Sequence, residues 1–376
     1  MKKSTSSIEL ACLAKEFQSI IDAKVNKIWL MGKKDDKELL IQLHLPSVGK
    51  KFLKIKAPDM AYLTDHKLET PDKPHGFCMF LRKRLNNARI RLIEQIDFER
   101  ILKIVFETKD AKYNFYIELF TPGNFILADE NNKIISALDT QKWKDREIRK
   151  GLDYICPKLK YNFLKLKKEE LTELIKSSDK ENIVKTLAIE LGLGGMYAEE
   201  LLFKAGIDKN KTKLSDKDIS SLFDIIKDFR KLKLDPILVG SEILPFNIQS
   251  FKDIDSIEKK SFKTFNEALD KTLTEHTITE KHEDEKKEAI KFINKEERIV
   301  ENQEEHIKKL KKQADDNQKI GEAIYHNYQL IDNLLKELKI ARQKHSWKEI
   351  KKILKEKGHK IIKEINERNN EVVIEI

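Results

Sequence analysis

The stretch FCMFLRKRLNNARIRLIEQIDFERILKIVFE (77–107), which continues after a short link as YIELFTPGNFILAD (116–129), decides the predicted fold. Its first part has the periodicity of a helix, with apolar residues on one side and cations around the rest. These cations are Arg82, Lys83, Arg84, Arg89 and Arg91. We therefore expect a helix that lies on a core and turns a basic face outward.

The second part of this stretch changes to the alternating period of strands. Apolar and polar side chains alternate over 101–107 and again over 113–119, and a Lys-Asp turn separates the two runs. Pro122-Gly123-Asn124 then interrupts the pattern before an apolar run at 125–128. The central helix is thus expected to pack on a sheet of consecutive strands.

The residues around this stretch extend the same unit. Hydroxyl residues at 4–7 precede an amphipathic run that reaches Ile21, which is typical of a capped helix. Alternation predicts further strands at 25–31, 37–45, 51–56 and 134–138. Prolines at 58, 71 and 74 indicate a loop that leads into the central helix.

A glycine-rich turn follows a helical region that begins at Lys167. Residues 191–198, LGLGGMYA, match the helix-hairpin-helix pattern of Gly, an apolar residue and Gly, with Ala four positions later. Glycine permits positive φ, so such a turn can bring backbone N–H groups to the start of a helix, where an anion is favoured. Gly192, Gly194 and Gly195 are therefore candidate phosphate contacts, although the same pattern also serves as a plain helix junction.

The C-terminal part has the heptad pattern of a coiled coil. Apolar residues recur on one seven-residue register from Ile293 to Leu335, broken only at Gly321, over a region of 286–344 without proline. We expect one helix of roughly 60 residues, about 90 Å long. Its seam needs a partner, and the later segments 346–357 and 360–366 are expected to be short helices. The chain is therefore interpreted as a fragment that lacks the partner helix, unless the seam pairs between two chains.

Composition restricts the classes of function. The net charge is +10, and the first 168 residues hold 34 Lys and Arg against 22 Asp and Glu, while the remainder is close to neutral. Such an excess suits a phosphate-binding surface, although a solvated lysine-rich surface also accounts for it. The cysteines, Cys12, Cys78 and Cys156, have no metal-ligand spacing. No catalytic constellation or nucleotide-binding glycine loop appears in the sequence, so we expect no enzyme, metal or cofactor. Glu9 and Lys15 interrupt the apolar stretch that a signal peptide needs, and this predicts a cytoplasmic protein.

Four segments resemble the N-terminal NFACT domain: 77–82, 98–101, 117–129, and 145–151 with Tyr154 and Pro157. NEMF and the RqcH-type proteins of this family are ribosome-associated quality-control factors. The resemblance implies an α+β, two-lobed domain related in shape to formamidopyrimidine-type DNA glycosylases, a helix-hairpin-helix module and a long coiled-coil helix. The expected divisions are 1–165, 166–212, 213–280, 281–345 and 346–376. The first is the α/β lobe, the second the hairpin module and the third the remainder of the NFACT-N region. The fourth is the coiled-coil helix, and the last holds short helices and a truncated middle segment.

The resemblance also implies partners and site residues. Members bind a large ribosomal subunit with its rRNA and a stalled peptidyl-tRNA, and hold tRNA, alanine tRNA by resemblance, while the ribosome adds untemplated residues. Glu9 and the Glu99-Arg100 pair, which is Asp-Arg in many members, are implied in tRNA handling. Arg82, Arg84 and Arg89 on the basic helix are further candidate tRNA contacts. An exposed helix-start carboxylate at Glu9 and a surface ion pair at 99–100 are the plain structural alternatives.

Two other functions fit parts of this pattern. A repair or processing protein on the glycosylase-like fold would bind nucleic acid, but those enzymes use an N-terminal proline as nucleophile and Lys2 occupies the second position here. A surface adhesin is the third hypothesis, since some relatives are labelled fibronectin-binding proteins. The lack of a secretion signal in the sequence disfavours it.

Overall fold

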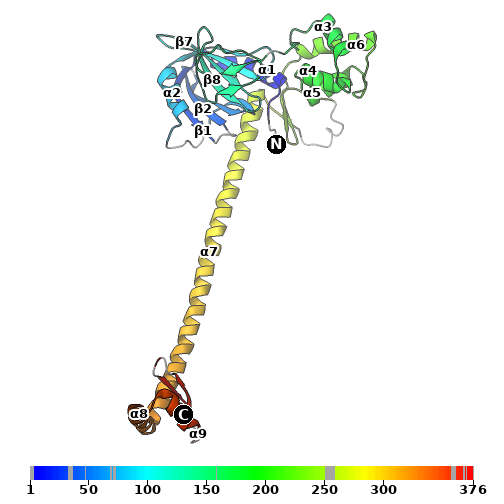
Figure 1. The fold of residues 1–376 in the computed structure, drawn as a ribbon. Helices are drawn as coiled ribbons and strands as arrows, with labels where there is room; N and C mark the ends of the chain where they lie inside the picture. The colour runs from blue at the N-terminus through cyan, green and yellow to red at the C-terminus, as the bar shows by residue number, and fades with distance from the viewer. Residues whose placement is uncertain are drawn as a thin grey trace. The chain divides into compact units, whose positions relative to one another are not determined.

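The computed structural model describes residues 4–32, 37–46, 48–67, 70, 73–157, 159–249, 259–356, 361–366, 369 and 371–375 (Figure 1). Within α7, the side chains of residues 276–285 and 288 lie outside this description, as do Lys2, Pro71 and the ends of the segments expected at 346–357 and 360–366. The chain forms two compact units, Met1–Ile278 and Thr279–Ile376. No described helix is long and apolar enough to span a membrane.

A nine-stranded antiparallel sheet forms the centre of the first unit. Its strands are β1 (Lys24–Met31), β2 (Lys37–Leu45), β3 (Gly49–Ala57), β4 (Met60–Thr64), β5 (Arg89–Gln95), β6 (Ile101–Glu107), β7 (Lys112–Glu118), β8 (Asn124–Asp129) and β9 (Ile134–Ala137). Their order is β4-β3-β2-β1-β5-β6-β7-β8-β9. A single registered pair, Lys24 with Arg89, joins β1 to β5. The sheet therefore consists of two halves that meet at this narrow junction.

Three helices pack on this sheet. Helix α1 (Ser7–Glu16) buries Leu10 and Leu13 in the main core, and α2 (Gly76–Leu85) packs on β1. The start of α7 (Phe265–His326) joins the same core through Phe265, whose backbone N–H donates to the Glu16 carboxylate at 2.8 Å. The carboxylate of α1 thus satisfies a donor that the first turn of α7 leaves without an intrahelical partner.

The central helix is shorter than the sequence predicts. It ends at Leu85, and Asn87 has a φ of +62°, so the chain turns before residue 88. Arg89 and Arg91 belong to strand β5, where Arg89 lies opposite Glu107, and not to the basic helix face. The expectation of five cations on one helix was wrong because the left-handed Asn87 stops the helix where the side-chain pattern alone does not.

Strand β4 occupies part of the segment predicted to be a loop. The chain reverses after Ala57 over Pro58 and Asp59, and Met60–Thr64 then pairs with β3. All five residues of β4 are buried. The prolines in this region led the pattern to predict a loop, but Pro58 lies in the turn itself, where it removes no ladder hydrogen bond.

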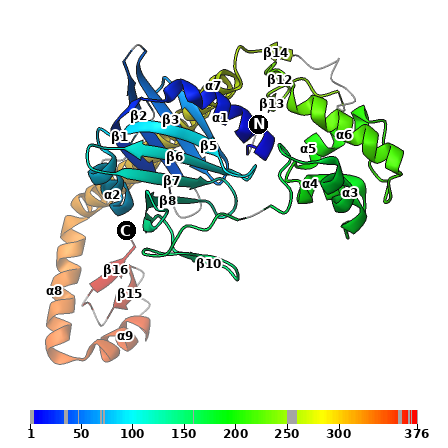
Figure 2. The same cartoon turned by 90° about the horizontal axis from the view of Figure 1, so that it is seen from above.

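A helical group follows the sheet in the first unit (Figure 2). It contains α3 (Lys168–Ser177), α4 (Ile183–Glu190), α5 (Gly195–Lys204) and α6 (Asp216–Arg230), followed by a small sheet of β12 (Ile237–Val239), β13 (Glu242–Leu244) and β14 (Lys259–Ser261). Helices α4 and α5 pack together across the glycine-rich turn, as the helix-hairpin-helix pattern predicts. In Figure 2 helix α5 faces the start of α1.

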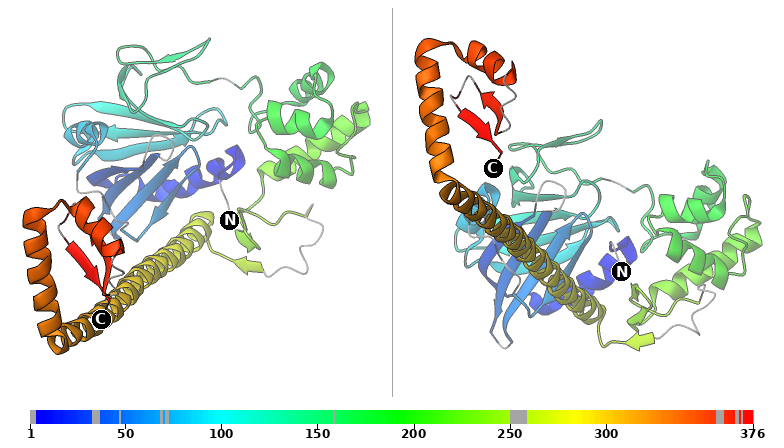
Figure 3. Two further views of the ribbon diagram at one scale, coloured as in Figure 1. Left: turned by 60° about the horizontal axis from the view of Figure 1, so that its bottom comes forward. Right: turned by 90° about the horizontal axis from the view of Figure 1, so that it is seen from below.

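The second unit holds most of α7 together with a small α/β module (Figure 3). The module contains α8 (Tyr328–Lys344), α9 (Trp347–Glu356), β15 (Ile362–Asn366) and β16 (Glu371–Ile374). The expected single helix to residue 344 is interrupted at Asn327 (φ −106°, ψ 21°), whereas Gly321, where the heptad register breaks, lies within α7. The expectation of a short helix at 360–366 was wrong, because residues 362–366 pair with β16 as a strand.

The predicted heptad seam of α7 is exposed. Ile293, Val300, Ile307 and Leu310 are each 50–53% exposed, whereas Leu338 on α8 is buried against the small module. No described residue of the second unit covers the stripe on α7. The seam is therefore an apolar stripe that is open to solvent, and this is the property from which the sequence predicted a partner helix.

Candidate functional site

Two ten-residue helices of the first unit, α1 and α5, begin at one cleft of ≈ 620 Å³, which we call the turn cleft. Its lining comprises Ser4, Thr5, Ser6, Ser7, Glu9, Arg100, Gly192, Leu193, Gly194, Gly195, Met196, Tyr197, Ser241 and Glu242. Five of the nine site residues predicted from the sequence lie in this cleft: Glu9, Arg100, Gly192, Gly194 and Gly195.

The glycine turn supplies one wall of the turn cleft. Gly192 and Gly194 have φ values of +65° and +76°, and Gly194 is the N-cap of α5. Gly195 is the first helical residue. The first backbone N–H groups of a helix lack intrahelical acceptors and carry the positive end of its dipole, so this wall favours an anion.

Glu9 forms the floor of the turn cleft and is only 2% exposed. Its Oε2 accepts from the backbone N–H of Ser6 at 2.8 Å, and the Ser6 hydroxyl accepts in return from the N–H of Glu9. Its Oε1 accepts from the Tyr197 hydroxyl at 2.6 Å. Glu9 is therefore not an exposed helix-start carboxylate: it caps α1 and ties it to α5 across 188 residues of sequence.

Arg100 supplies the cation of the turn cleft. Its Nη2 donates to the backbone oxygens of Pro58 (2.9 Å) and Asp59 (3.4 Å), while Nε is buried without a hydrogen-bond partner among the described residues. Burial lowers the pKa of the guanidinium, and the charges of Asp59 and Glu9 oppose that effect. No described carboxylate forms an ion pair with Arg100: its hydrogen bonds go to neutral carbonyls, and the charges of Asp59 and Glu9 act on it without direct contact.

Glu99 does not share this cleft, although it is adjacent to Arg100 in sequence. Its electrostatic neighbours are Asp97 and Arg146, and it raises the pKa of the Cys156 thiol. Burial raises the pKa of Glu99 itself, Asp97 adds to the effect, and Arg146 opposes it. The alternative of a surface ion pair between Glu99 and Arg100 is thus not observed. The Arg100 side chain lines the turn cleft, whereas Glu99 lies near Arg146 and Cys156.

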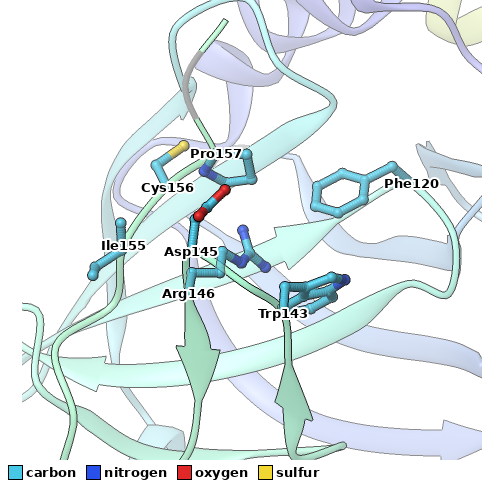
Figure 4. Close-up of a pocket in the computed structure, with 7 residues that line it drawn as sticks. All are labelled: Phe120, Trp143, Asp145, Arg146, Ile155, Cys156 and Pro157. Carbon is cyan, nitrogen blue, oxygen red and sulfur yellow. The ribbon is translucent and has the colours of Figure 1, made fainter.

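The place near Glu99 is a second cavity of ≈ 590 Å³, which we call the aromatic pocket. Phe120, Trp143, Asp145, Arg146, Ile155, Cys156 and Pro157 line it (Figure 4). Trp143 and Arg146 come from the turn between the two short strands β10 (Gln141–Lys142) and β11 (Glu147–Ile148). Figure 4 shows the Arg146 guanidinium pointing into the space between the Phe120 and Trp143 rings.

A buried ion pair fixes the cation of the aromatic pocket. Arg146 Nη2 lies 2.5 Å from Glu118 Oε1, and the two side chains are 8% and 1% exposed. The Tyr154 hydroxyl donates to the same oxygen at 2.9 Å. Burial raises the pKa of Glu118, against the opposing effect of Arg146. This network orients the arginine and leaves its Nη1 buried without a partner among the described residues.

The rings around Arg146 make the pocket suitable for a flat ligand. The guanidinium lies 4.5 Å from the Trp143 ring centroid and 5.8 Å from that of Phe120. Trp143 is 38% exposed, so part of its face is open. A planar group can stack on it and accept from Arg146 Nη1. Sequence reasoning assigned no role to Glu118 or Arg146, even though both lie in segments that carry the family resemblance.

The three arginines predicted for the basic helix lie outside both cavities. Arg82 Nε donates to the backbone oxygen of Ile28 at 2.6 Å. Arg84 stacks 3.8 Å from the centre of the Phe80 ring. Arg89 Nη1 donates to the backbone oxygen of Asp22 at 3.1 Å. They belong to a separate surface around α2 and β5, and their role as tRNA contacts stays a prediction.

Comparison with known proteins places these features in a family. A family model described as NFACT N-terminal and middle domains matches residues 6–372. A relative named archaeal Rqc2 homolog aRqcH, from Methanocaldococcus jannaschii, is 33% identical over 100% of this chain and 58% of its own length. The human ribosome quality control complex subunit NEMF is 26% identical over 95% of this chain and 36% of its own length. The chain thus spans between a third and three fifths of these two relatives.

Solved structures share the fold of the first part. The N-terminal part of the fibronectin/fibrinogen-binding protein of Streptococcus suis has a TM-score of 0.57 at 22% identity, and covers 72% of this chain and 100% of its own. The fibrinogen binding protein of Staphylococcus aureus has a TM-score of 0.56 at 20% identity, and covers 70% and 97%. At such identities the similarity concerns the fold alone. With its family model matched over almost the whole chain, the protein belongs to the NFACT family.

Proposed function

We propose that this chain acts in ribosome-associated quality control and that its first unit holds tRNA. Support for the first statement comes from relatives whose names place them in ribosome quality control. Because the chain spans only part of those relatives, their activity is carried over here as a proposal. In this role it binds the large ribosomal subunit with its rRNA and stalled peptidyl-tRNA.

The observation that carries tRNA binding is the meeting of two helix N-termini and Arg100 in the turn cleft, which Glu9 and Glu242 also line. The first turn of α1 already holds the Glu9 carboxylate, so the first turn of α5 and Arg100, which has no ion pair among the described residues, are the elements left to an anion. Helix N-termini and an arginine fork are both favourable partners for phosphate oxygens. We assign the turn cleft to one phosphate of the tRNA backbone.

The aromatic pocket complements this role with a different chemistry. Its cation is already neutralised by Glu118, so a phosphate gains little charge attraction there. A nucleobase can instead stack on Trp143 and accept from Arg146 Nη1, while Glu99 nearby can accept from a base N–H. Glu99 and Arg100 would then both contact tRNA, Glu99 through a base in the aromatic pocket and Arg100 through the backbone in the turn cleft.

Neither cavity supplies a nucleophile or a general base in this scheme. The chain positions tRNA, and the ribosome forms the peptide bonds of the untemplated tail. Selection of alanine tRNA is the most specific statement of the proposal, and the family resemblance alone supports it.

Sequencing of RNA recovered with the full chain from cells tests this function. We expect a few tRNA species, alanine tRNA first among them, to be enriched with the wild type and lost with Glu99→Ala/Arg100→Ala. The variant Lys295→Ala/Arg298→Ala removes two exposed cations of α7 outside both cavities and serves as the matched control. Equal, sequence-independent recovery by all three proteins would contradict tRNA selection by the two cavities.

A further inference from the structure

A third cavity lies in the second unit and is lined mostly by lysines. This groove of ≈ 740 Å³ runs between α9 and β15, and we call it the lysine groove. Its lining comprises Lys348, Lys351, Lys352, Leu354, Lys355, Ile362, Lys363, Glu364 and Ile365. The lining thus has five lysines and one glutamate, and one of the lysines, Lys363, lies 3.7 Å from Glu375.

Helix geometry places four of these lysines on one face of α9. Lys348, Lys351, Lys352 and Lys355 follow the spacing i, i+3, i+4 and i+7, which forms a single row along a helix. The opposite face carries Ile350, which is 3% exposed and packs with α8 and β15. Packing uses the apolar face, and from the row Lys351 adds a hydrogen bond to the backbone oxygen of Ile365 in β15.

The row is electrostatically uncompensated among the described residues. Lys348, Lys352 and Lys355 form no ion pair there, and Lys351 donates to the backbone oxygen of Ile365 at 3.2 Å. Lys336 on α8, by contrast, is paired within its helix and lies 2.6 Å from Asp332. Like charges at i and i+4 destabilise a helix, and α9 has two such pairs, 348 with 352 and 351 with 355. A polyanion bound along the row would relieve this repulsion.

We propose that the lysine groove binds the phosphodiester backbone of RNA, separately from the tRNA cavities of the first unit. Lysine acts as a point charge, so a row of lysines follows a chain of phosphates without reading its sequence. An acidic peptide fits less well, because the apolar lining residues Leu354, Ile362 and Ile365 are buried or half-buried and offer no exposed anchor. The inference extends the proposed function by giving the second unit its own RNA contact, for which ribosomal RNA is the source.

Salt dependence of binding to a duplex RNA of generic sequence tests the lysine groove in the full chain. Each lost phosphate contact lowers the slope of log K against log salt by about 0.7–0.9. Lys352→Ala/Lys355→Ala should therefore lower it by about 1.4–1.8, so that the wild type loses about tenfold more affinity than the variant between 50 and 200 mM salt. Lys336→Ala, which changes an exposed but paired lysine of the same unit, is the control.

Two outcomes would overturn the proposal. One is a slope in Lys352→Ala/Lys355→Ala equal to that of the wild type. The other is loss of binding to poly-glutamate with duplex RNA binding intact, which would make an acidic peptide the partner. Since tRNA enrichment depends on Arg100 and the slope difference on α9, either the proposed function or this inference can fail alone.

Discussion

Arg100 and Arg146 are both largely buried, and each keeps one nitrogen without a hydrogen-bond partner among the described residues, yet their charges are compensated differently. Arg146 forms an ion pair with Glu118, whereas Arg100 donates to two backbone carbonyls and feels Asp59 and Glu9 only through space. An arginine in an ion pair can still orient a ligand by hydrogen bonding and stacking, but it attracts an anion weakly. An arginine whose hydrogen bonds go to backbone carbonyls keeps more of its attraction for an anion. Glu99 and Arg100, adjacent residues of the turn between β5 and β6, connect the two sites. We infer that one sequence motif serves a base pocket and a phosphate cleft at once.

The largest effect is expected from breaking the buried pair of the aromatic pocket. Glu118→Ala leaves Arg146 buried without its counter-ion, so the free energy of unfolding should fall by about 3–5 kcal/mol. Urea unfolding of the full chain measures this loss. The triple variant Glu118→Leu/Arg146→Met/Tyr154→Phe removes all three polar partners and should recover most of the stability. A triple variant as unstable as Glu118→Ala would show that the buried charge is not the cause.

A smaller effect is expected for the hydrogen bond that supports the turn cleft. Tyr197→Phe removes the donor to Glu9 Oε1 and should lower stability by about 1–3 kcal/mol. Tyr325→Phe changes a side chain that is 80% exposed and should have no effect. Urea unfolding again reports both values. Equal stabilities of the two variants would mean that α1 and α5 do not depend on this bond.

Two neighbouring glycines allow a matched test of the turn. Gly194 has a φ of +76°, so Gly194→Ala should cost about 1–2 kcal/mol. Gly195 is helical and a Cβ there meets nothing within 4 Å, so Gly195→Ala should be neutral or slightly stabilising. Thermal unfolding of the two variants compares them directly. Similar losses of stability in the two variants would mean that steric contact of the added Cβ, and not the positive φ of Gly194, determines the cost.

The smallest effect concerns the Cys156 thiol in the aromatic pocket. Burial raises its pKa to about 12, so the neutral thiol dominates at pH 8 and alkylation should accelerate about tenfold per pH unit above that. In a Cys12→Ala/Cys78→Ala background, bound tRNA should slow this labelling, whereas inorganic phosphate should not. If inorganic phosphate alone protected Cys156 from alkylation, the anion would bind in the aromatic pocket and not in the turn cleft, which would contradict the assignment.

The sequence predicted most elements of the first unit but not how they combine. The α+β class, the strands at 25–31, 37–45 and 101–107 and the glycine turn follow from local periodicity, which is a property of neighbouring residues. The end of the central helix at Leu85 did not follow, because Asn87 fixes it through a backbone conformation that side-chain pattern does not encode.

The composition of the two cavities depended on contacts distant in sequence. Glu99 and Arg100 were expected to act as a pair, but each lies with residues from other strands and turns. The bond between Tyr197 and Glu9 joins positions 188 residues apart, and no local pattern can predict it. Glu118 and Arg146 are brought together in the same way.

The most direct test of the central claim is the salt dependence of binding to purified alanine tRNA by the full chain. We expect Arg100→Ala to lower affinity by about tenfold or more and to reduce the slope of log K against log salt by about 0.7–0.9, since one charged phosphate contact is lost. Arg298→Ala, which removes an exposed arginine of α7 outside both cavities, should change neither. Identical slopes and affinities for Arg100→Ala and Arg298→Ala would contradict the assignment of the turn cleft to a tRNA phosphate.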